Sequence, residues 1–135
     1  MCTVRVWDLN LGVEVRTIQG HGKGVCSVSF MDNGNLISAS KDGTARLWRL
    51  SARGRDLENT SSEISTSIMH PDIVREVVIS ADGKTMISAS RDCTLRVWDT
   101  KTWKLREELK GHKDWVWCVA ISDDSSLAIS VGYDR

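Results

Sequence analysis

Short runs of apolar and β-branched residues alternate along this chain with turn-forming sequences rich in Asp, Asn, Ser and Gly. Short runs bounded in this way are typical of β-strands. The segment 103–109 has some helical character by itself, but its alignment with the other runs predicts a strand there. Mixed or apolar runs, of the kind expected for strands covered on both faces, lie at 25–30, 74–79 and 116–121. After a turn, a second short run follows each of them, at 36–40, 86–90 and 127–131.

Two further kinds of run complete the pattern. A third run, in which polar and apolar residues alternate, lies at 3–7, 44–48 and 94–98. A fourth and more polar run lies at 13–18, 64–69 and 105–109. Because the same order of runs recurs, the sequence predicts an all-β chain built from repeated units of four strands.

Individual residues recur in register with these runs. The recurring tryptophan ends an Arg-hydrophobic-Trp sequence and stands at Trp7, Trp48 and Trp98. The recurring histidine lies four residues before a valine and stands at His21, His70 and His112. The recurring aspartate closes a serine-containing segment and stands at Asp42, Asp92 and Asp134. Repeats of this length indicate a chain of structurally equivalent units.

The repeat also has a Gly-His pair before the first run, at 20–21 and 111–112, and a Trp-Asp pair after the third, at 7–8 and 98–99. With these features the sequence resembles the WD40 repeat family over essentially its whole length. The resemblance implies a β-propeller, in which each blade is a four-stranded antiparallel sheet around a central channel.

On this resemblance, residues 1–135 form a single repeat region with two complete blades and one split blade. The complete blades occupy 21–69 and 70–111, and the split blade has its third and fourth strands at 1–20 and its first and second strands at 112–135. The first complete blade contains a long polar loop at 51–66. A passive surface loop and a binding loop both remain open for this segment.

The resemblance further implies a hydrogen-bonded group inside each blade, made of a His, a Ser, an Asp and a Trp. The expected members are His21, Ser38, Asp42 and Trp48, then His70, Ser88, Asp92 and Trp98, then His112, Ser130 and Asp134, to which Trp7 corresponds. Indole N–H only donates and carboxylate only accepts, while hydroxyl and neutral imidazole do both, so such a buried chain of groups can be fully satisfied. A catalytic triad occurs once, whereas this set recurs with the structural period, so we expect a structural role.

Composition narrows the possible functions. The chain has 18 basic and 18 acidic residues, so direct nucleic-acid binding is not expected. Its four cysteines show no C-x-x-C spacing, and no apolar run is long enough to cross a bilayer, so we expect no metal, no cofactor and no membrane contact. Charge and Trp near residue 1, where a secretory signal would be apolar, favour a cytoplasmic location, with a nuclear one also open.

The expected function is that of a non-enzymatic scaffold that binds protein partners and assembles a multiprotein complex. Positions before the turn aspartate and at the start of the first strand are expected at one face, and the candidates for partner binding there are Lys41, Arg75, Arg91, Trp117 and Tyr133. Alternatives are a subunit of a nucleic-acid-associated or phosphopeptide-recognising complex, and, least favoured, an enzyme. Trp115 is expected to pack rather than to bind.

Three blades cannot close a ring, because propellers have four to eight. Two sources of additional blades are open. The chain is either part of a longer WD40 array, or it pairs with a second copy to form a homodimer of six blades, with residues 3–7 of each chain against residues 127–131 of the other.

Overall fold

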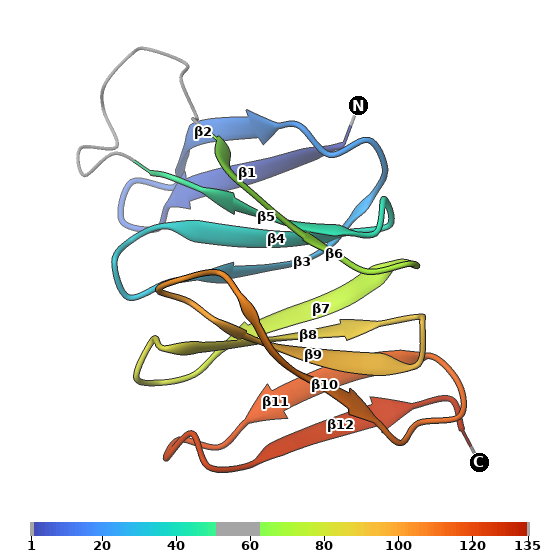
Figure 1. Cartoon of the computed structure of the whole chain (residues 1–135). Coiled ribbons are helices and arrows are strands. Elements are labelled where there is room, and N and C mark those ends of the chain that lie inside the picture. Colours follow the sequence, from blue (N-terminus) through green and yellow to red (C-terminus); the bar gives the residue numbers. More distant parts are fainter. Residues whose placement is uncertain (1, 51–62, 135) are drawn as a thin grey trace.

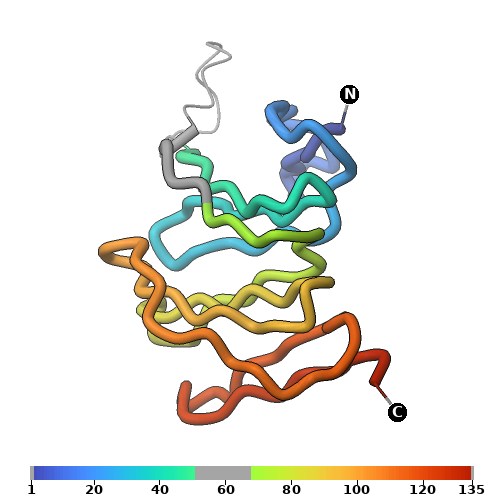
Figure 2. The backbone as a smooth tube through the Cα atoms, turned by 45° about the vertical axis from the view of Figure 1, so that its right-hand side comes forward, coloured from blue at the N-terminus to red at the C-terminus, as the bar shows by residue number. Residues whose placement is uncertain are grey.

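The structure is a computed structural model, and it describes residues 2–50 and 63–134. In this part of the chain, twelve β-strands form four antiparallel sheets, and no helix is present. The four sheets stack side by side in chain order (Figure 1). The backbone tube in Figure 2 shows the same stack from another direction, with the N-terminal and C-terminal sheets at opposite ends. The predicted all-β fold class is therefore confirmed.

The two outer sheets have two strands each and the two inner sheets have four. The first sheet contains β1 (Thr3–Asp8) and β2 (Val13–Gln19). The second contains β3 (Val25–Phe30), β4 (Leu36–Ser40), β5 (Thr44–Trp48) and β6 (Glu63–Met69). The third contains β7 (Val74–Ile79), β8 (Thr85–Ser90), β9 (Thr94–Asp99) and β10 (Leu105–Lys110). The fourth contains β11 (Val116–Ile121) and β12 (Ala128–Gly132).

The long loop predicted at 51–66 needs a correction at its C-terminal end. Strand β6 begins at Glu63, because Glu63 lies opposite Trp48 in the antiparallel pairing with β5. Residues 63–66 therefore belong to the strand, and residues 51–62 lie outside the described residues.

The second strand of each four-stranded sheet is the most completely covered element. All five residues of β4 are buried, as are the last five of β8. Each of these strands has hydrogen-bonded neighbours on both sides and further sheets packed on its two faces. This position explains the run of small and apolar residues without alternation, because neither face of the strand meets water.

Adjacent sheets are held together by apolar side chains that meet between them. Ile37 and Ala45 of the second sheet lie in one buried cluster with Val77, Met86 and Trp98 of the third. Similar clusters join the first sheet to the second and the third to the fourth. Burial of each large apolar side chain contributes about 1.5–3 kcal/mol, so these clusters are the main source of stability in the stack.

The first strand of each blade contains a β-bulge at the same place. The pairing register shifts between Val25 and Ser27, and Cys26 is the residue left between the paired positions. Arg75 and Trp117 have the same place in β7 and β11. A bulge bends the strand and changes the direction of the extra side chain, so the fold presents one residue from each blade in an equivalent way.

Candidate functional site

The structure brings His21, Ser38, Asp42 and Trp48 together in the second sheet. The Nδ1 atom of His21 lies 2.9 Å from Oδ2 of Asp42, and its Nε2 atom lies 2.7 Å from Oγ of Ser38. The indole nitrogen of Trp48 donates to the same Oγ atom over 2.8 Å. A carboxylate only accepts, so Nδ1 carries the proton and Nε2 accepts from the Ser38 hydroxyl. Every polar group of the set is satisfied with the imidazole in its neutral form.

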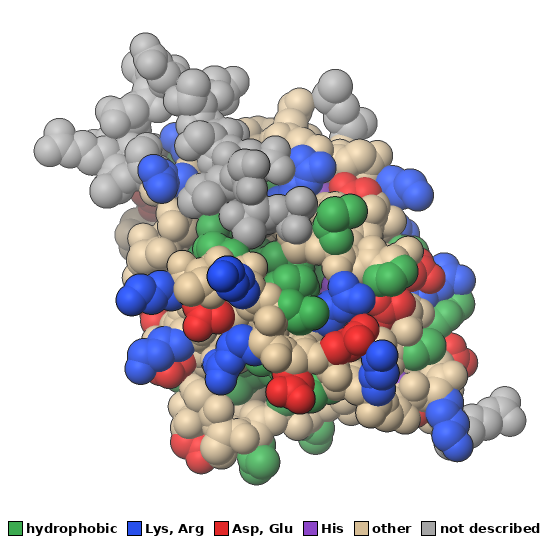
Figure 3. All heavy atoms as spheres, in the orientation of Figure 1, with side chains coloured by type: hydrophobic (Ala, Val, Ile, Leu, Met, Phe, Trp, Pro, Cys, Tyr) green, Lys and Arg blue, Asp and Glu red, His purple; other side chains and the backbone are tan. Residues whose placement is uncertain are grey.

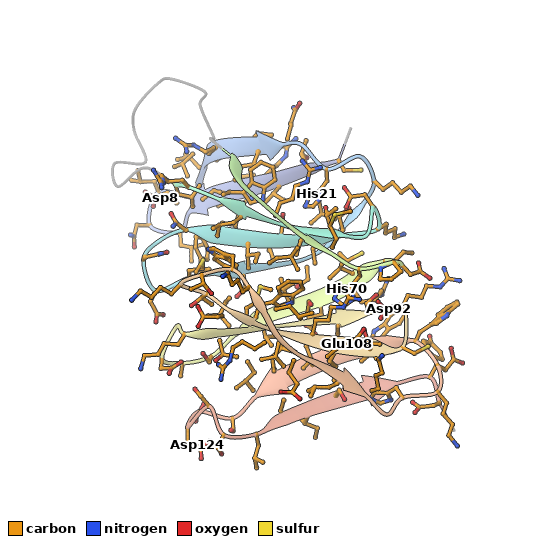
Figure 4. The ribbon with its side chains drawn as sticks, in the orientation of Figure 1. Asp8, His21, His70, Asp92, Glu108 and Asp124 are labelled. Atoms are coloured by element: carbon orange, nitrogen blue, oxygen red, sulfur yellow. The ribbon has the colours of Figure 1, made fainter. Side chains whose placement is uncertain are left out.

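The third sheet repeats this arrangement with His70, Ser88, Asp92 and Trp98. The two imidazole contacts measure 2.8 Å to Asp92 and 2.7 Å to Ser88, and the Trp98 indole donates to Ser88 over 2.9 Å. Figure 4 shows His21, His70 and Asp92 on one side of the stack, at the right of the view, and Asp8 and Asp124 on the other side, at the left. We call each such set a blade network.

Each complete blade network has a further hydroxyl that the sequence analysis did not identify. Thr44 donates from Oγ1 to Oδ1 of Asp42 over 2.6 Å, and Thr94 does the same to Asp92. The sequence carried a signal for both, because threonine follows the turn aspartate by two residues in each blade.

These contacts determine how the buried groups ionise. Burial opposes ionisation of Asp42, but hydrogen bonds from Thr44, His21 and the backbone outweigh it and lower the pKa of Asp42 to about 2. The pKa of Asp92 is also lowered, because bonds from Thr94 and His70 outweigh its burial. Burial lowers the pKa of His70, although Asp92 opposes this effect. In the third sheet, the lowered pKa values of His70 and Asp92 thus favour the neutral imidazole and the ionised carboxylate.

The fourth sheet has only three members of a blade network. His112 contacts Asp134 over 2.7 Å and Ser130 over 2.8 Å. Trp7 is not near them, because it belongs to the first sheet at the opposite end of the stack, where it is 53% exposed. This agrees with the sequence analysis, in which the third set has no Trp of its own.

The connectivity of a blade network resembles that of a serine-hydrolase triad, in which Asp orients His and His activates Ser. However, Ser38 and Ser88 are both 0% exposed, and each accepts an indole N–H at the oxygen a substrate would have to reach. The complete networks are consequently suited to holding strands in register rather than to attacking a substrate.

A second group of side chains gathers on the side of the stack that carries the histidines. The guanidinium carbon of Arg75 lies 3.7 Å above the centre of the Trp117 ring, and that of Arg91 lies 3.6 Å above the Trp115 ring. Tyr133 contacts both indoles edge to face, with ring centres 6.0 Å from Trp115 and 5.5 Å from Trp117. We call these five residues the Arg–aromatic cluster.

The Arg–aromatic cluster is open to solvent although its members hold one another in place. Trp115, Trp117 and Tyr133 are 38%, 45% and 58% exposed. Stacking on an indole limits the motion of each guanidinium without consuming its N–H donors. The cluster is therefore a preorganised surface of the residue types that dominate binding interfaces.

Lys41 lies apart from the aromatic rings but shares a hollow with Arg91. This hollow has a volume of about 400 Å³, and its lining includes Lys23, Lys41, Asp72 and Arg91. Oδ2 of Asp72 lies 3.9 Å from Nε of Arg91, which is a weak ion pair at a partly exposed position. The structure thus places the five predicted partner-binding residues on one side of the stack.

Trp115 is the member of the cluster that sequence analysis assigned to packing. In the structure it stacks on Arg91 at the surface instead. Sequence spacing gave no signal for this position, because Trp115 precedes β11 and Trp117 is the extra residue of the bulge, so strand alternation does not relate the two side chains.

Residues 2–50 and 63–134 also allow statements on metal sites and on membrane-spanning helices. No group of three or more His, Cys, Asp or Glu side chains there is arranged to hold a metal ion. That same part of the chain contains no helix with the length and apolar character needed to cross a membrane.

Comparison with known proteins gives one family and several relatives. The family model described as "WD domain, G-beta repeat" matches residues 12–49, 62–99 and 103–135. Nuclear distribution protein PAC1 of Arthroderma otae is 34% identical over 144 residues, covering 98% of this chain and 30% of that protein. WD repeat and SOCS box-containing protein 1 of Danio rerio is 51% identical over 136 residues, covering 97% of this chain and 30% of that protein. The chain thus spans about a third of the length of these curated relatives.

Proposed function

The chain belongs to the WD40 repeat family, and from this premise we propose that it is a non-enzymatic platform that binds protein partners through the Arg–aromatic cluster. WD40 repeat proteins are generally interaction scaffolds, and this chain presents a specific surface for that role. The observation that carries the proposal is the stacking of Arg75 on Trp117 and of Arg91 on Trp115 at an exposed face.

The energetics favour a binding role over a stabilising one for these rings. A cation–π contact at an exposed site contributes only about 0.5–1 kcal/mol to folding. The same aromatic area contributes far more when a partner covers it, because binding energy concentrates in desolvated Trp, Tyr and Arg side chains. Removal of Trp117 should therefore weaken partner binding more than it weakens the fold.

A second candidate is recognition of an anionic peptide, including a phosphopeptide. It is favoured by the hollow that Lys23, Lys41 and Arg91 share, since arginine binds phosphate and carboxylate groups through paired N–H donors. Nucleic-acid binding has less support. The formal net charge is zero, and Figure 3 shows basic and acidic side chains interspersed on the face in view.

The platform proposal is tested by comparing partner capture with thermal stability. Proteins retained by the wild-type chain are identified by mass spectrometry, and capture is repeated with Trp117→Ala and Arg75→Gln. The exposed Lys101→Gln change, in the β9–β10 turn on the opposite side of the stack, is the matched surface control. We expect Trp117→Ala and Arg75→Gln to lose the same partners while the melting temperature stays close to that of the wild type. Equal loss of binding and stability would assign these residues to folding instead.

The non-enzymatic part of the proposal has a separate test. A fluorophosphonate probe, which labels activated serines, should leave Ser38, Ser88 and Ser130 unmodified. Labelling of Ser130, whose network is the most accessible of the three, would contradict this part of the proposal.

A further inference from the structure

We propose that Glu76 is a positioning residue for the Arg–aromatic cluster, and that its hydrogen bond to the backbone of β11 holds Arg75 over the Trp117 ring. This inference rests on the platform function proposed above, because it names a residue that prepares the binding surface without belonging to it. Glu76 follows Arg75 in β7 and reaches the same neighbouring strand.

Two consecutive residues of β7 contact β11. The guanidinium carbon of Arg75 lies 3.7 Å above the centre of the Trp117 ring, and Oε2 of Glu76 accepts the backbone N–H of Val119 over 2.7 Å. A hydrogen bond to a carboxylate is among the stronger ones in a folded chain, whereas a cation–π contact at an exposed site is weak by itself. The bond from Val119 to Glu76 is therefore the contact that is able to fix the spacing of β7 and β11 beside the cluster.

The β-bulge in β7 explains why both side chains reach the fourth sheet. In a regular strand, consecutive side chains point to opposite faces of the sheet. Val74 and Val77 lie in the apolar cluster shared with the second sheet, and Val78 packs against the one shared with the fourth. Strict alternation back from Val77 would direct Arg75 toward the second sheet. The register shift between Val74 and Glu76 makes Arg75 the extra residue and directs it to the fourth sheet beside Glu76.

The position of the Arg75 guanidinium depends on this spacing. Its Nε atom is buried and has no hydrogen-bond partner among the described residues, so no polar contact fixes the guanidinium at that atom. A gap of about 0.5–1 Å already forfeits a quarter to a half of a van der Waals contact. Val119 is 2% exposed, whereas Trp117 is 45% exposed. The bond to Glu76 therefore ties the exposed pair to a buried part of β11.

The Glu76 carboxylate also holds the residue between Trp117 and Val119. A hydrogen bond to Glu76, together with burial, raises the pKa of the Cys118 thiol. Glu76 thus contacts both residues that follow Trp117 in the chain, and a shift of β11 against β7 would disturb both contacts.

The interface between the second and third sheets offers a comparison within the molecule. Cys26 and Ser27 of β3 occupy the places that Arg75 and Glu76 occupy in β7. A cysteine has no cation to place over a ring, and a serine side chain is much shorter than that of glutamate. The cation and the long carboxylate are thus both absent from these positions of β3, which supports a role of the carboxylate in placing the cation.

Nuclear magnetic resonance of the full chain tests the proposal, because protons of Arg75 that lie above the Trp117 ring resonate upfield. The Trp117→Ala variant gives their resonance position without the ring. Glu76→Gln keeps a carbonyl oxygen at the same reach, whereas Glu76→Asp keeps the charge but is one methylene group shorter. Ser27→Ala, at the equivalent position of β3, is the matched control. The melting temperature of each variant verifies that it folds.

We expect Glu76→Gln and Ser27→Ala to keep the upfield shift of Arg75, and Glu76→Asp to lose about half of it or more. The shift of Arg91 over Trp115 should remain in all three variants and serves as the internal reference, since the contacts of Glu76 lie at the other pair. Retention of the Arg75 shift in Glu76→Asp, or its loss in Glu76→Gln, would overturn the proposal. Equal loss at both pairs, or loss of the fold in Glu76→Asp, would do the same by assigning Glu76 to general folding.

Partner capture by the same variants separates this inference from the platform function. Glu76→Asp should retain less partner than the wild type, and Glu76→Gln should retain as much. Loss of the Arg75 shift without loss of capture would support the positioning role and contradict binding through the cluster. An unchanged Arg75 shift in Glu76→Asp would overturn the positioning role whatever the capture result.

Discussion

The indole nitrogen of Trp48 lies 2.8 Å from the hydroxyl oxygen of Ser38, ten residues earlier in the chain and one strand away. The Ser38 hydroxyl donates a hydrogen bond to Nε2 of His21, and Nδ1 of His21 donates to Asp42. A side chain of the third strand is thus connected through the second strand to the loop before the first. The blade network therefore fixes the relative positions of three segments of one sheet.

Removal of the indole donor should lower stability. In Trp48→Phe the buried Ser38 oxygen loses a hydrogen-bond donor, which costs about 1–3 kcal/mol, and the smaller ring leaves a cavity that adds to the loss. The free energy of unfolding from urea titration measures the effect. Trp7→Phe is the matched control, because Trp7 has no such partner in the single chain and is half exposed. Equal effects of the two changes would contradict a structural role for the network.

Stability should fall in acid because of Asp42. Its pKa in the folded chain is about 2, below the value of about 3.9 for an unfolded chain, so the unfolded state binds the proton first as the pH falls. The contribution of Asp42 is present above about pH 4 and is lost between about pH 4 and pH 2. Asp42→Asn should reduce the pH dependence in this window, measured by urea unfolding at each pH. A pH dependence that Asp42→Asn leaves unchanged in this window would contradict the assignment.

His70 should add a second pH dependence nearer neutrality. Burial lowers its folded pKa below the usual value of about 6.5, so the unfolded state again takes up the proton first. Stability from this group is complete above about pH 6.5 and declines as the pH falls below it, by at most about 1.4 kcal/mol per pH unit. The His70→Gln variant should lose this part of the slope, and an unchanged slope between pH 7 and pH 5 would refute the assignment.

Gly43 and Cys93 occupy equivalent turns between the second and third strands, and substitutions at these two positions should have opposite effects on stability. Gly43 has a φ of 84°, and an added Cβ atom would lie 3.1 Å from the carbonyl oxygen of His70. Cys93 occupies the matching place with a φ of 70°. A side chain costs about 1–2 kcal/mol in this left-handed region, so Gly43→Ala should be destabilising. Cys93→Gly should be neutral or stabilising, because relief of strain offsets the greater freedom of glycine in the unfolded chain. Thermal unfolding of both variants would show the difference, and equal destabilisation would contradict it.

The strand order could be predicted from sequence because the repeats align with one another. An isolated segment such as 103–109 has some helical character, and its register with the strand at 13–18 corrected that local preference. The blade networks could be predicted for the same reason, since residues equivalent to His21, Ser38 and Asp42 recur at fixed places in the repeat. Thr44 was not predicted as a member, because a threonine at the start of a strand is explained by its β-propensity alone.

The Arg–aromatic cluster could be predicted only in part. Its members stand at equivalent positions of different blades, so the face was predictable, but the stacking of Arg91 on Trp115 depends on how the third and fourth sheets pack. Sequence spacing describes one blade at a time and does not give the distance between side chains of neighbouring blades.

Hydrogen exchange of the six indole N–H groups, followed by ¹H–¹⁵N NMR, tests the central claim most directly. The claim is that Trp48 and Trp98 fasten the blades from inside while Trp115 and Trp117 are available at the surface. We predict slow exchange for Trp48 and Trp98, at rates limited by unfolding, and fast exchange for Trp115 and Trp117. Equally fast exchange at all four positions, or protection of the surface pair alone, would contradict the account.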